Sequence, residues 1–416
     1  MAVFSRMSGS PEAPAREPVT LPQGKLAGAA AALELDVLRG FAACLMIVNH
    51  AGFKWLAPQQ LSGGGLAMAV FLGGFAPVLF FFATGFGTGL GTASKGRASP
   101  FIAALEKAVL LIVADQFLFW RSGVAWGLDF FGFIALSLLL VSAIARSPAS
   151  VRLACALAIG AVLLRFALAP LVRHLLPATG VLAWATGATG QPDISYPAAP
   201  WFVYPAIGYA LGYLYAGDRH TRWIRLGLAI TAASALGAVL LAWRGISFHR
   251  WGSVNLGFFV ASWAVLGASG IAAMWLARHR RSVARVLGLR GVGSFAVVPI
   301  HYALLEAWHA IAPGDLSAPA FVLAVVALVV ASLWLSARFD EWVAISHVRF
   351  DGLRWKEPLA LLLLVACGAA TWLLVEPSPQ LAFAFSITGQ LAVAYLLAKR
   401  AQPLTRLFGR PRSQAA

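Results

Sequence analysis

Apolar residues in this chain are grouped into blocks of about twenty, the length that an α-helix needs to cross a bilayer. Twelve such blocks follow one another, near residues 35–55, 66–90, 101–120, 124–145, 151–172, 197–216, 223–243, 256–277, 291–311, 318–338, 357–375 and 380–398. Charged residues make up only 12% of the chain, about half of their share in soluble domains. The sequence therefore predicts an all-α, polytopic integral membrane bundle of ten to twelve transmembrane helices, with twelve as the expected number.

Basic residues are distributed unevenly between alternate loops. If the N-terminus is cytoplasmic, the inside loops and tails carry 25 Lys and Arg residues and the outside loops carry 5. Such a bias predicts the orientation of a membrane protein, so both termini are expected in the cytoplasm. Because the basic residues lie in short loops between apolar blocks, the formal charge of +16 does not predict a nucleic-acid partner. We expect a multi-pass protein of the inner (plasma) membrane.

The apolar blocks also define the domain organisation. Residues 1–30 are rich in Pro, Ala and polar residues and predict a disordered cytoplasmic tail, without the apolar region of a signal peptide. Residues 31–400 form one transmembrane domain, and 401–416 form a second cytoplasmic tail. The longest outward loop, 173–196, is expected to dip into the interface or to cover a site from outside. The three cysteines lie in apolar blocks without metal-ligand spacing, so no metal site is predicted.

Two ionisable side chains, Arg39 and His50, lie in the first apolar block, within LDVLRGFAACLMIVNHAG. Ionisable residues inside the membrane are costly and commonly mark functional sites. The eleven-residue step between them returns to nearly the same helix face, about 16 Å further along. A structural interpretation stays open for both: Arg39 can pair with Asp36 or reach the head groups, and His50 can be a hydrogen-bonded interface residue.

Further polar residues occur deep in other apolar blocks. His301 is expected near the middle of the membrane, followed five residues later by Glu306, and a second buried histidine favours a polar chamber. The alternative is a core histidine satisfied by a neighbouring helix. Asp115 lies deep in its own block and therefore needs a partner, for which we expect an Arg or a His.

Five residues complete the set of candidate ligand contacts. Lys95 and Arg97 are expected at the cytoplasmic mouth, where they can hold phosphates or simply follow the positive-inside rule. Asn49 precedes His50, and Thr84 lies beside a run of phenylalanines that can line a substrate path. Trp201 lies between two prolines, which predicts a broken helix of the kind that lines cavities.

The residues from Leu35 to Gly52 resemble the opening helix of the membrane-bound acyltransferase superfamily. This superfamily comprises acyltransferase family 3 and the heparan-alpha-glucosaminide N-acetyltransferase-like family, also known as domain of unknown function 1624. Arg39 and His50 match the Arg and His that are separated by ten residues in family 3. The stretches PVLFFFATGF, LDFFGFIALSLLL, YPAAPWFVYPAIGYALG and GVGSFAVVPIHYALL resemble later helices in order and character, and the resemblance covers about 33–311. Thr84 replaces the Ser of the family pattern, and Val298-Pro299-Ile300 replaces the usual Tyr before the late His.

The resemblance implies transfer of an acyl group, most often acetyl, from cytoplasmic acyl-CoA to an acceptor on the far side of the membrane. The acceptor is expected to be a hydroxyl or amine of a glycan or another envelope component. In this interpretation His50 is the general base or an acylated nucleophile, and Arg39 orients the donor or stabilises negative charge. His301 aligns with the late histidine of the family, and Lys95 and Arg97 hold the CoA phosphates.

A polytopic secondary transporter or a flippase for lipid-linked substrates is the competing function class. Twelve helices with broken segments and buried ionisable residues also suit a secondary carrier. However, the sequence shows neither an inverted repeat nor paired broken helices in its two halves. The oligomeric state, the acceptor and the choice between O- and N-acylation are left open by the residues.

Overall fold

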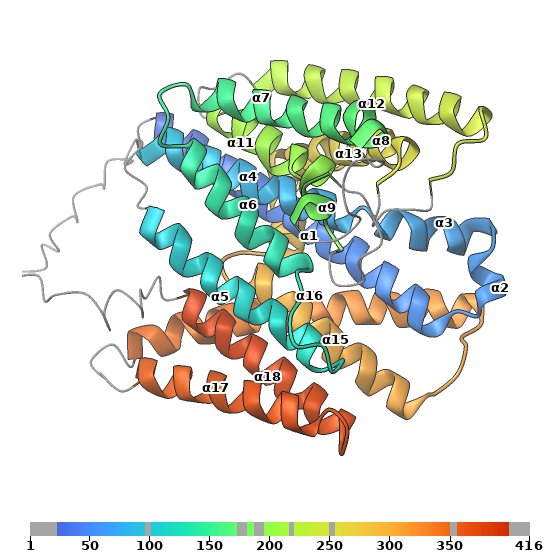
Figure 1. The fold of residues 1–416 in the computed structure, drawn as a ribbon, viewed down its shortest axis with the longest axis vertical. Helices are drawn as coiled ribbons and strands as arrows, with labels where there is room; N and C mark the ends of the chain where they lie inside the picture. Colours follow the sequence, from blue (N-terminus) through green and yellow to red (C-terminus); the bar gives the residue numbers. More distant parts are fainter. Residues whose placement is uncertain are drawn as a thin grey trace, which may run out of the picture.

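The computed structural model describes residues 23–95, 101–172, 181–186, 195–215, 220–248, 254–349 and 356–398. Within these ranges the regular structure is helical, which confirms the predicted all-α class (Figure 1). The helices are α1 (Gln23–Trp55), α2 (Pro58–Leu61), α3 (Gly64–Gly73), α4 (Ala76–Lys95), α5 (Phe101–Trp120), α6 (Phe130–Ile144), α7 (Ser150–Leu163), the π-helical η1 (Leu164–Leu168), α8 (Ala169–Val172), α9 (Val181–Thr186), α10 (Ala198–Trp201), α11 (Val203–Tyr215), α12 (His220–Trp243), α13 (Leu256–His279), α14 (Arg281–Leu287), α15 (Gly293–Ile311), α16 (Ala318–Arg349), α17 (Lys356–Leu374) and α18 (Pro379–Ala398).

Every predicted apolar block overlaps one or more of these helices, although several boundaries differ. Helix α1 begins at Gln23, inside the segment that was predicted as a tail, because the run LAGAAAALEL is rich in Ala, Leu and Glu, which are strong helix formers. Helix α6 begins only at Phe130, six residues after the start of the predicted block. In the predicted cover loop 173–196, the structure describes α9 and residues 195–196, and the remaining residues lie outside the described ranges.

Six helical spans among the described residues are long and apolar enough to cross a membrane, so the protein is a multi-pass membrane protein. Helices α1, α5 and α15 have 33, 20 and 19 residues, but each carries ionisable side chains that reduce its apolar character. The ionisable residues that make α1 and α15 candidates for a functional site are thus the same residues that lower the mean hydropathy of these helices. The number of twelve spans and the cytoplasmic position of both termini stay predictions.

Helix α1 runs through the centre of the bundle and packs against α3, α4, α13, α14, α15 and α16 (Figure 1). Helices α4 and α11 approach each other closely, because glycines alternate along both contact faces. A Cβ atom at Gly85 or Gly89 would collide with the backbone of α11, and one at Gly208 or Gly212 would collide with the backbone of α4. The glycines at these positions therefore allow the two helix backbones to pack directly against each other.

Candidate active site

His50 of α1 and His301 of α15 meet inside the bundle. Nδ1 of His50 lies 2.8 Å from Nε2 of His301, and the ring centroids are 5.1 Å apart with an interplanar angle of 21°. His301 has no exposed surface, and His50 is partly buried. The two histidines that the sequence singled out separately thus form one direct hydrogen-bonded pair.

The second ring nitrogen of His301 determines the direction of this hydrogen bond. Nδ1 of His301 lies 2.9 Å from the carbonyl oxygen of Val297. Because a carbonyl oxygen only accepts, Nδ1 of His301 carries the proton and its Nε2 is the acceptor when the ring is neutral. His50 must then donate from Nδ1, which leaves its Nε2 without a proton. This chain of two bonds presents an unprotonated nitrogen of His50, the state that a general base requires.

Tyr302 and Arg121 extend the pair on one side. The Tyr302 ring stacks at 4.9 Å from the His50 ring and 4.4 Å from the His301 ring. The Arg121 guanidinium carbon lies 5.0 Å from the centre of the Tyr302 ring and 5.5 Å from that of Phe383, within the range of cation–π contacts. A positive charge therefore lies one aromatic ring away from the histidines.

Sequence reasoning missed Tyr302 and Arg121 as site residues. Tyr302 follows His301 directly in the chain, and Arg121 is one of the five basic residues expected outside. A tyrosine beside a histidine and an arginine in a loop are both common, so neither residue was distinctive in the sequence.

An ion pair lies one helical turn beyond the histidines and joins the same two helices. Nζ of Lys54 is 3.1 Å from the carboxylate of Glu306, and both side chains are about one-third exposed. Lys54 follows His50 by four residues and Glu306 follows Tyr302 by four, so the pair stacks on the histidine layer. A backbone bond from the Leu316 amide to the Trp55 carbonyl, at 2.8 Å, adds to this connection between α1 and the chain after α15.

Asp115 has a different partner from the Arg or His that we expected. Its carboxylate accepts the backbone N–H of Asp129 at 2.6 Å and that of Phe131 at 3.1 Å. These N–H groups belong to the start of α6, where the first turn has no intrahelical acceptors. The prediction was wrong because a buried carboxylate can be satisfied by a helix N-terminus as well as by a cation. Asp115 therefore caps the start of α6, which lies six residues after the start of the predicted block.

Arg39 lies apart from the histidine pair. Its guanidinium is 3.3 Å from Asp36, whose other oxygen is 3.8 Å from Arg290. A Cβ added at Gly87 would lie 3.5 Å from the Arg39 guanidinium, so the side chain faces α4. Since Arg39 and His50 are separated by about 16 Å along α1, Arg39 does not contact the histidines.

The three residues predicted to bind substrate contact other residues of the protein. The Asn49 amide donates to the Val70 carbonyl at 2.8 Å, joining α1 to α3. The Thr84 hydroxyl donates to the Phe80 carbonyl of its own helix at 2.9 Å. Trp201 is fully buried against the rings of Tyr196 and Phe81, and its indole N–H has no hydrogen-bond partner among the described residues. The Trp201 indole N–H is thus a buried donor that is available to a ligand.

The predicted phosphate contacts fall at the edge of what is described. Lys95 is the last residue of α4, and its side chain is not described, while Arg97 lies outside the described residues. Among the described residues, no three His, Cys, Asp or Glu side chains are grouped as metal ligands.

The described residues thus form an all-helical, multi-pass membrane bundle in which a histidine pair between two helices supplies acid–base groups. Residues 32–247, more than half of the chain, match the heparan-alpha-glucosaminide N-acetyltransferase catalytic family, and the chain belongs to that family. His50 lies within the matched region and His301 lies beyond it. Comparisons with curated proteins and with solved structures give no match.

Proposed function

We propose that the protein transfers an acyl group, most often acetyl, from cytoplasmic acyl-CoA to a hydroxyl or amine of an extracytoplasmic glycan or another envelope acceptor. Membership of an acetyltransferase family supports the reaction type. The observation that carries the proposal is the pair of hydrogen bonds from His50 to His301 and from His301 to Val297. Together they leave Nε2 of His50 as a proton acceptor inside the bundle.

The chemistry follows from that nitrogen. The acceptor O–H or N–H gives its proton to Nε2 of His50 while its oxygen or nitrogen attacks the thioester carbonyl carbon. The tetrahedral intermediate then expels the CoA thiolate, which takes the proton back from the His50 imidazolium. The products are the acylated acceptor and free CoA. In the alternative order, Nε2 of His50 attacks the thioester carbonyl and expels the CoA thiolate. The acceptor then attacks the acyl-imidazole, the bond from Nε2 to the acyl carbon breaks, and the acceptor proton passes to the thiolate.

His301 and Arg121 have supporting roles in this reaction. The acceptor nitrogen of His301 stabilises the N–H of a His50 imidazolium, which forms when the proton is taken up. The Arg121 charge beyond the Tyr302 ring favours a developing negative charge on the thioester oxygen or an anionic acceptor. His301 thus acts as a positioning residue through His50.

The donor is proposed to enter from the cytoplasmic end of α1. Arg39, Lys95 and Arg97 supply positive charge there for the CoA phosphates, and Arg guanidinium groups are suited to bidentate phosphate contacts. The pantetheine arm is long and flexible, so it can carry the thioester past Arg39 towards His50. Asn49, Thr84 and Trp201 are retained as proposed substrate contacts. Family membership favours this reaction over the transporter alternative.

The experiment that tests the function is transfer of radiolabelled acetyl from acetyl-CoA by the full-length protein, purified in detergent. We expect CoA release and label transfer to envelope polysaccharides of the producing cell, and neither with His50→Ala. Binding of acetyl-CoA without any CoA release, under conditions where the protein is folded, would overturn the proposal. Net movement of acetyl-CoA across a liposome membrane without acetylation would favour the transporter.

A further inference from the structure

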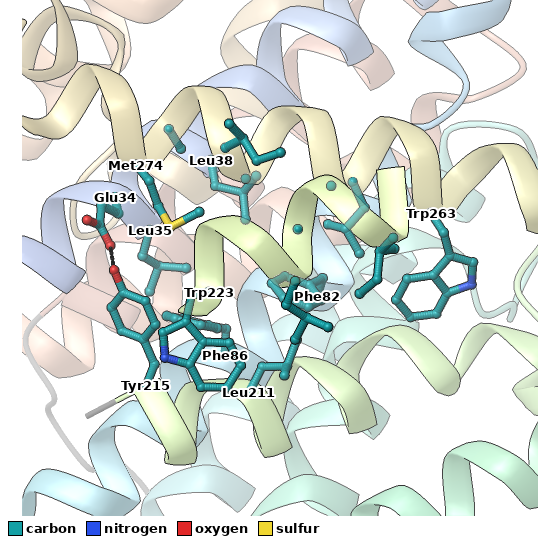
Figure 2. A pocket seen from close by; sticks show the side chains of 18 residues that line it. Glu34, Leu35, Leu38, Phe82, Phe86, Leu211, Tyr215, Trp223, Trp263 and Met274 are labelled. Carbon is teal, nitrogen blue, oxygen red and sulfur yellow. Dashed lines mark hydrogen bonds between the residues drawn. The ribbon is translucent and has the colours of Figure 1, made fainter. Parts of the chain in front are cut away.

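A groove lined by apolar side chains runs along one side of the bundle, separate from the histidine pair. The groove has a volume of about 810 Å³, which includes the space at its open side. It lies between helices α1, α4, α11, α12 and α13. Figure 2 shows Glu34, Tyr215 and Trp223 at one end and Trp263 at the other. Helix α12 forms the outer wall and is the most peripheral of the spanning helices, with Leu226 and Leu228 exposed. The groove is therefore open to the lipid phase.

The dimensions of the groove match one lipid tail. Trp263 and Met274 lie at opposite ends of the α13 wall, eleven residues or about 16 Å apart. The hydrocarbon core of a bilayer is about 30 Å thick, so one leaflet accounts for about half of that. A groove of this length, starting at one end of the bundle, can hold a single alkyl chain of the adjacent leaflet.

The narrow polar end of the groove has unused hydrogen-bonding capacity. The Glu34 side chain is 7% exposed, and one carboxylate oxygen accepts from the Tyr215 hydroxyl. The other oxygen, Oε1, has no hydrogen bond among the described residues and lies 3.7 Å from Nε of Arg278. The indole N–H of Trp223 also has no partner among the described residues. A buried acceptor and a buried donor thus meet at the same end, and groups of this kind are costly unless a ligand satisfies them.

Two exposed arginines lie next in sequence or in space to residues of this polar end. The Arg278 side chain is 40% exposed and follows Met274 by one helical turn. Arg222 precedes Trp223 directly and is exposed. A ligand that fits both features carries a phosphate for the arginines and a hydrogen-bond donor with positive charge for Oε1 of Glu34.

We propose that this groove binds an aminophospholipid of the phosphatidylethanolamine class, with one acyl chain between α12 and α13, its phosphate at Arg278 and Arg222, and its ammonium at Glu34. The groove is unsuited to the reacting donor. A thioester beside Glu34 would lie sixteen residues, or about 24 Å, from His50 along α1. The proposal is independent of the acyl-transfer reaction.

Gly270 offers a variant that fills the groove without straining the fold. It lines the groove on α13, and a Cβ atom added there meets nothing within 4 Å. Gly160 on α7 is equally open and lies outside the groove, so Gly160→Leu is the matched control. Both changes replace a helical glycine by leucine, and only Gly270→Leu places the side chain where the lipid tail is expected.

The test is native mass spectrometry and thermal unfolding of the full-length, delipidated protein in detergent, with phosphatidylethanolamine, phosphatidylcholine or phosphatidylglycerol added. We expect phosphatidylethanolamine to be retained about tenfold better than the other two, because they lack the ammonium N–H donors. Gly270→Leu should abolish retention and Gly160→Leu should not. Glu34→Gln should retain lipid but lose the preference for phosphatidylethanolamine over phosphatidylcholine.

Three results would overturn the proposal. Equal retention of all three lipids would exclude the proposed head-group contacts. Unchanged retention in Gly270→Leu would place the lipid elsewhere. Displacement of the lipid by long-chain acyl-CoA at equal concentration would identify the groove as a donor site. His50→Ala is expected to retain the lipid fully, and this result would separate the groove from the histidine pair.

Discussion

Nδ1 of His50 and Nε2 of His301 lie 2.8 Å apart, although the two residues are separated by 251 positions in the chain. The bond from His301 to the Val297 carbonyl orders the protons along this pair, so that Nε2 of His50 is left free. The pair is held from both sides by its own helices, through the stacked Tyr302 ring and the Lys54–Glu306 ion pair. The proposed chemistry therefore depends on how α1 and α15 pack as much as on either histidine.

Replacing His50 tests the general base. His50→Ala should lower acetyl transfer by about 10²–10⁴-fold, the usual contribution of a general base. His50→Asn should have the same effect, because an amide cannot accept a proton near neutral pH. The measurement is label transfer from acetyl-CoA, with His279→Ala as the control, since His279 is exposed at the end of α13. If His50→Ala keeps more than about a tenth of the activity, His301 becomes the first alternative base.

Replacing His301 distinguishes a positioning role from a catalytic one. His301→Gln can place an amide oxygen where Nε2 of His301 accepts the hydrogen bond from the His50 N–H. His301→Leu leaves that N–H without an acceptor. We expect His301→Leu to lower kcat about tenfold or more with KM for acetyl-CoA unchanged, and His301→Gln to recover most of the loss. Equal losses in the two variants would show that the histidine itself takes part in proton transfer.

Removal of the Asp115 carboxylate should affect stability more than chemistry. Asp115→Ala leaves the N–H groups of Asp129 and Phe131 without their acceptor, at a cost of about 1–3 kcal/mol for each. Asp115→Asn keeps one acceptor oxygen and should lose less. Thermal unfolding in detergent measures the difference, and Asp315→Ala, at an exposed position, is the control. An unfolding temperature unchanged by Asp115→Ala would contradict the capping role.

The Lys54–Glu306 ion pair can be examined by exchanging its charges. Lys54→Glu and Glu306→Lys each place like charges opposite each other, where the native pair lies 3.1 Å apart, and the double exchange restores an attractive pair. Because both side chains are about one-third exposed, we expect a coupling free energy of about 0.5–1 kcal/mol. Thermal unfolding of the four proteins gives this value. Purely additive effects would show that the contact contributes nothing to the packing of α1 on α15.

Patterns local in the chain predicted much of the fold. Blocks of about twenty apolar residues correspond to helices along the whole described chain, because crossing a bilayer requires both apolar side chains and internal backbone hydrogen bonds. The Arg39–His50 spacing also pointed to α1, now the central helix of the bundle. In both cases the determining interactions lie within one segment.

Contacts between segments that are far apart in the chain could not be predicted from such local patterns. The meeting of His50 with His301 depends on the packing of α1 against α15, and no periodicity encodes which helices become neighbours. Asp115 was assigned a charged partner, whereas the start of α6 supplies backbone N–H groups that every helix possesses. The groove at Glu34 is lined by ordinary Leu, Trp and Gly residues from five helices, so none of them stands out in the sequence.

Donor binding provides a test of the residues at the N-terminal half of α1. A ligand that binds only the folded protein raises its thermal stability, so acetyl-CoA should stabilise the purified protein. Arg39→Ala should reduce this shift by weakening the donor about tenfold, the effect of losing one charge-assisted contact. Lys95→Ala combined with Arg97→Ala should reduce it further.

The control for donor binding is Arg338→Ala. Arg338 pairs with Glu341 at 2.8 Å on an exposed stretch of α16, so its loss removes a similar ion pair without touching α1. We also expect His50→Ala to keep the full shift, because the proposed role of His50 involves the acceptor and the thioester rather than the CoA phosphates. If Arg39→Ala binds acetyl-CoA as tightly as the unaltered protein, the role of Arg39 is confined to its ion pair with Asp36.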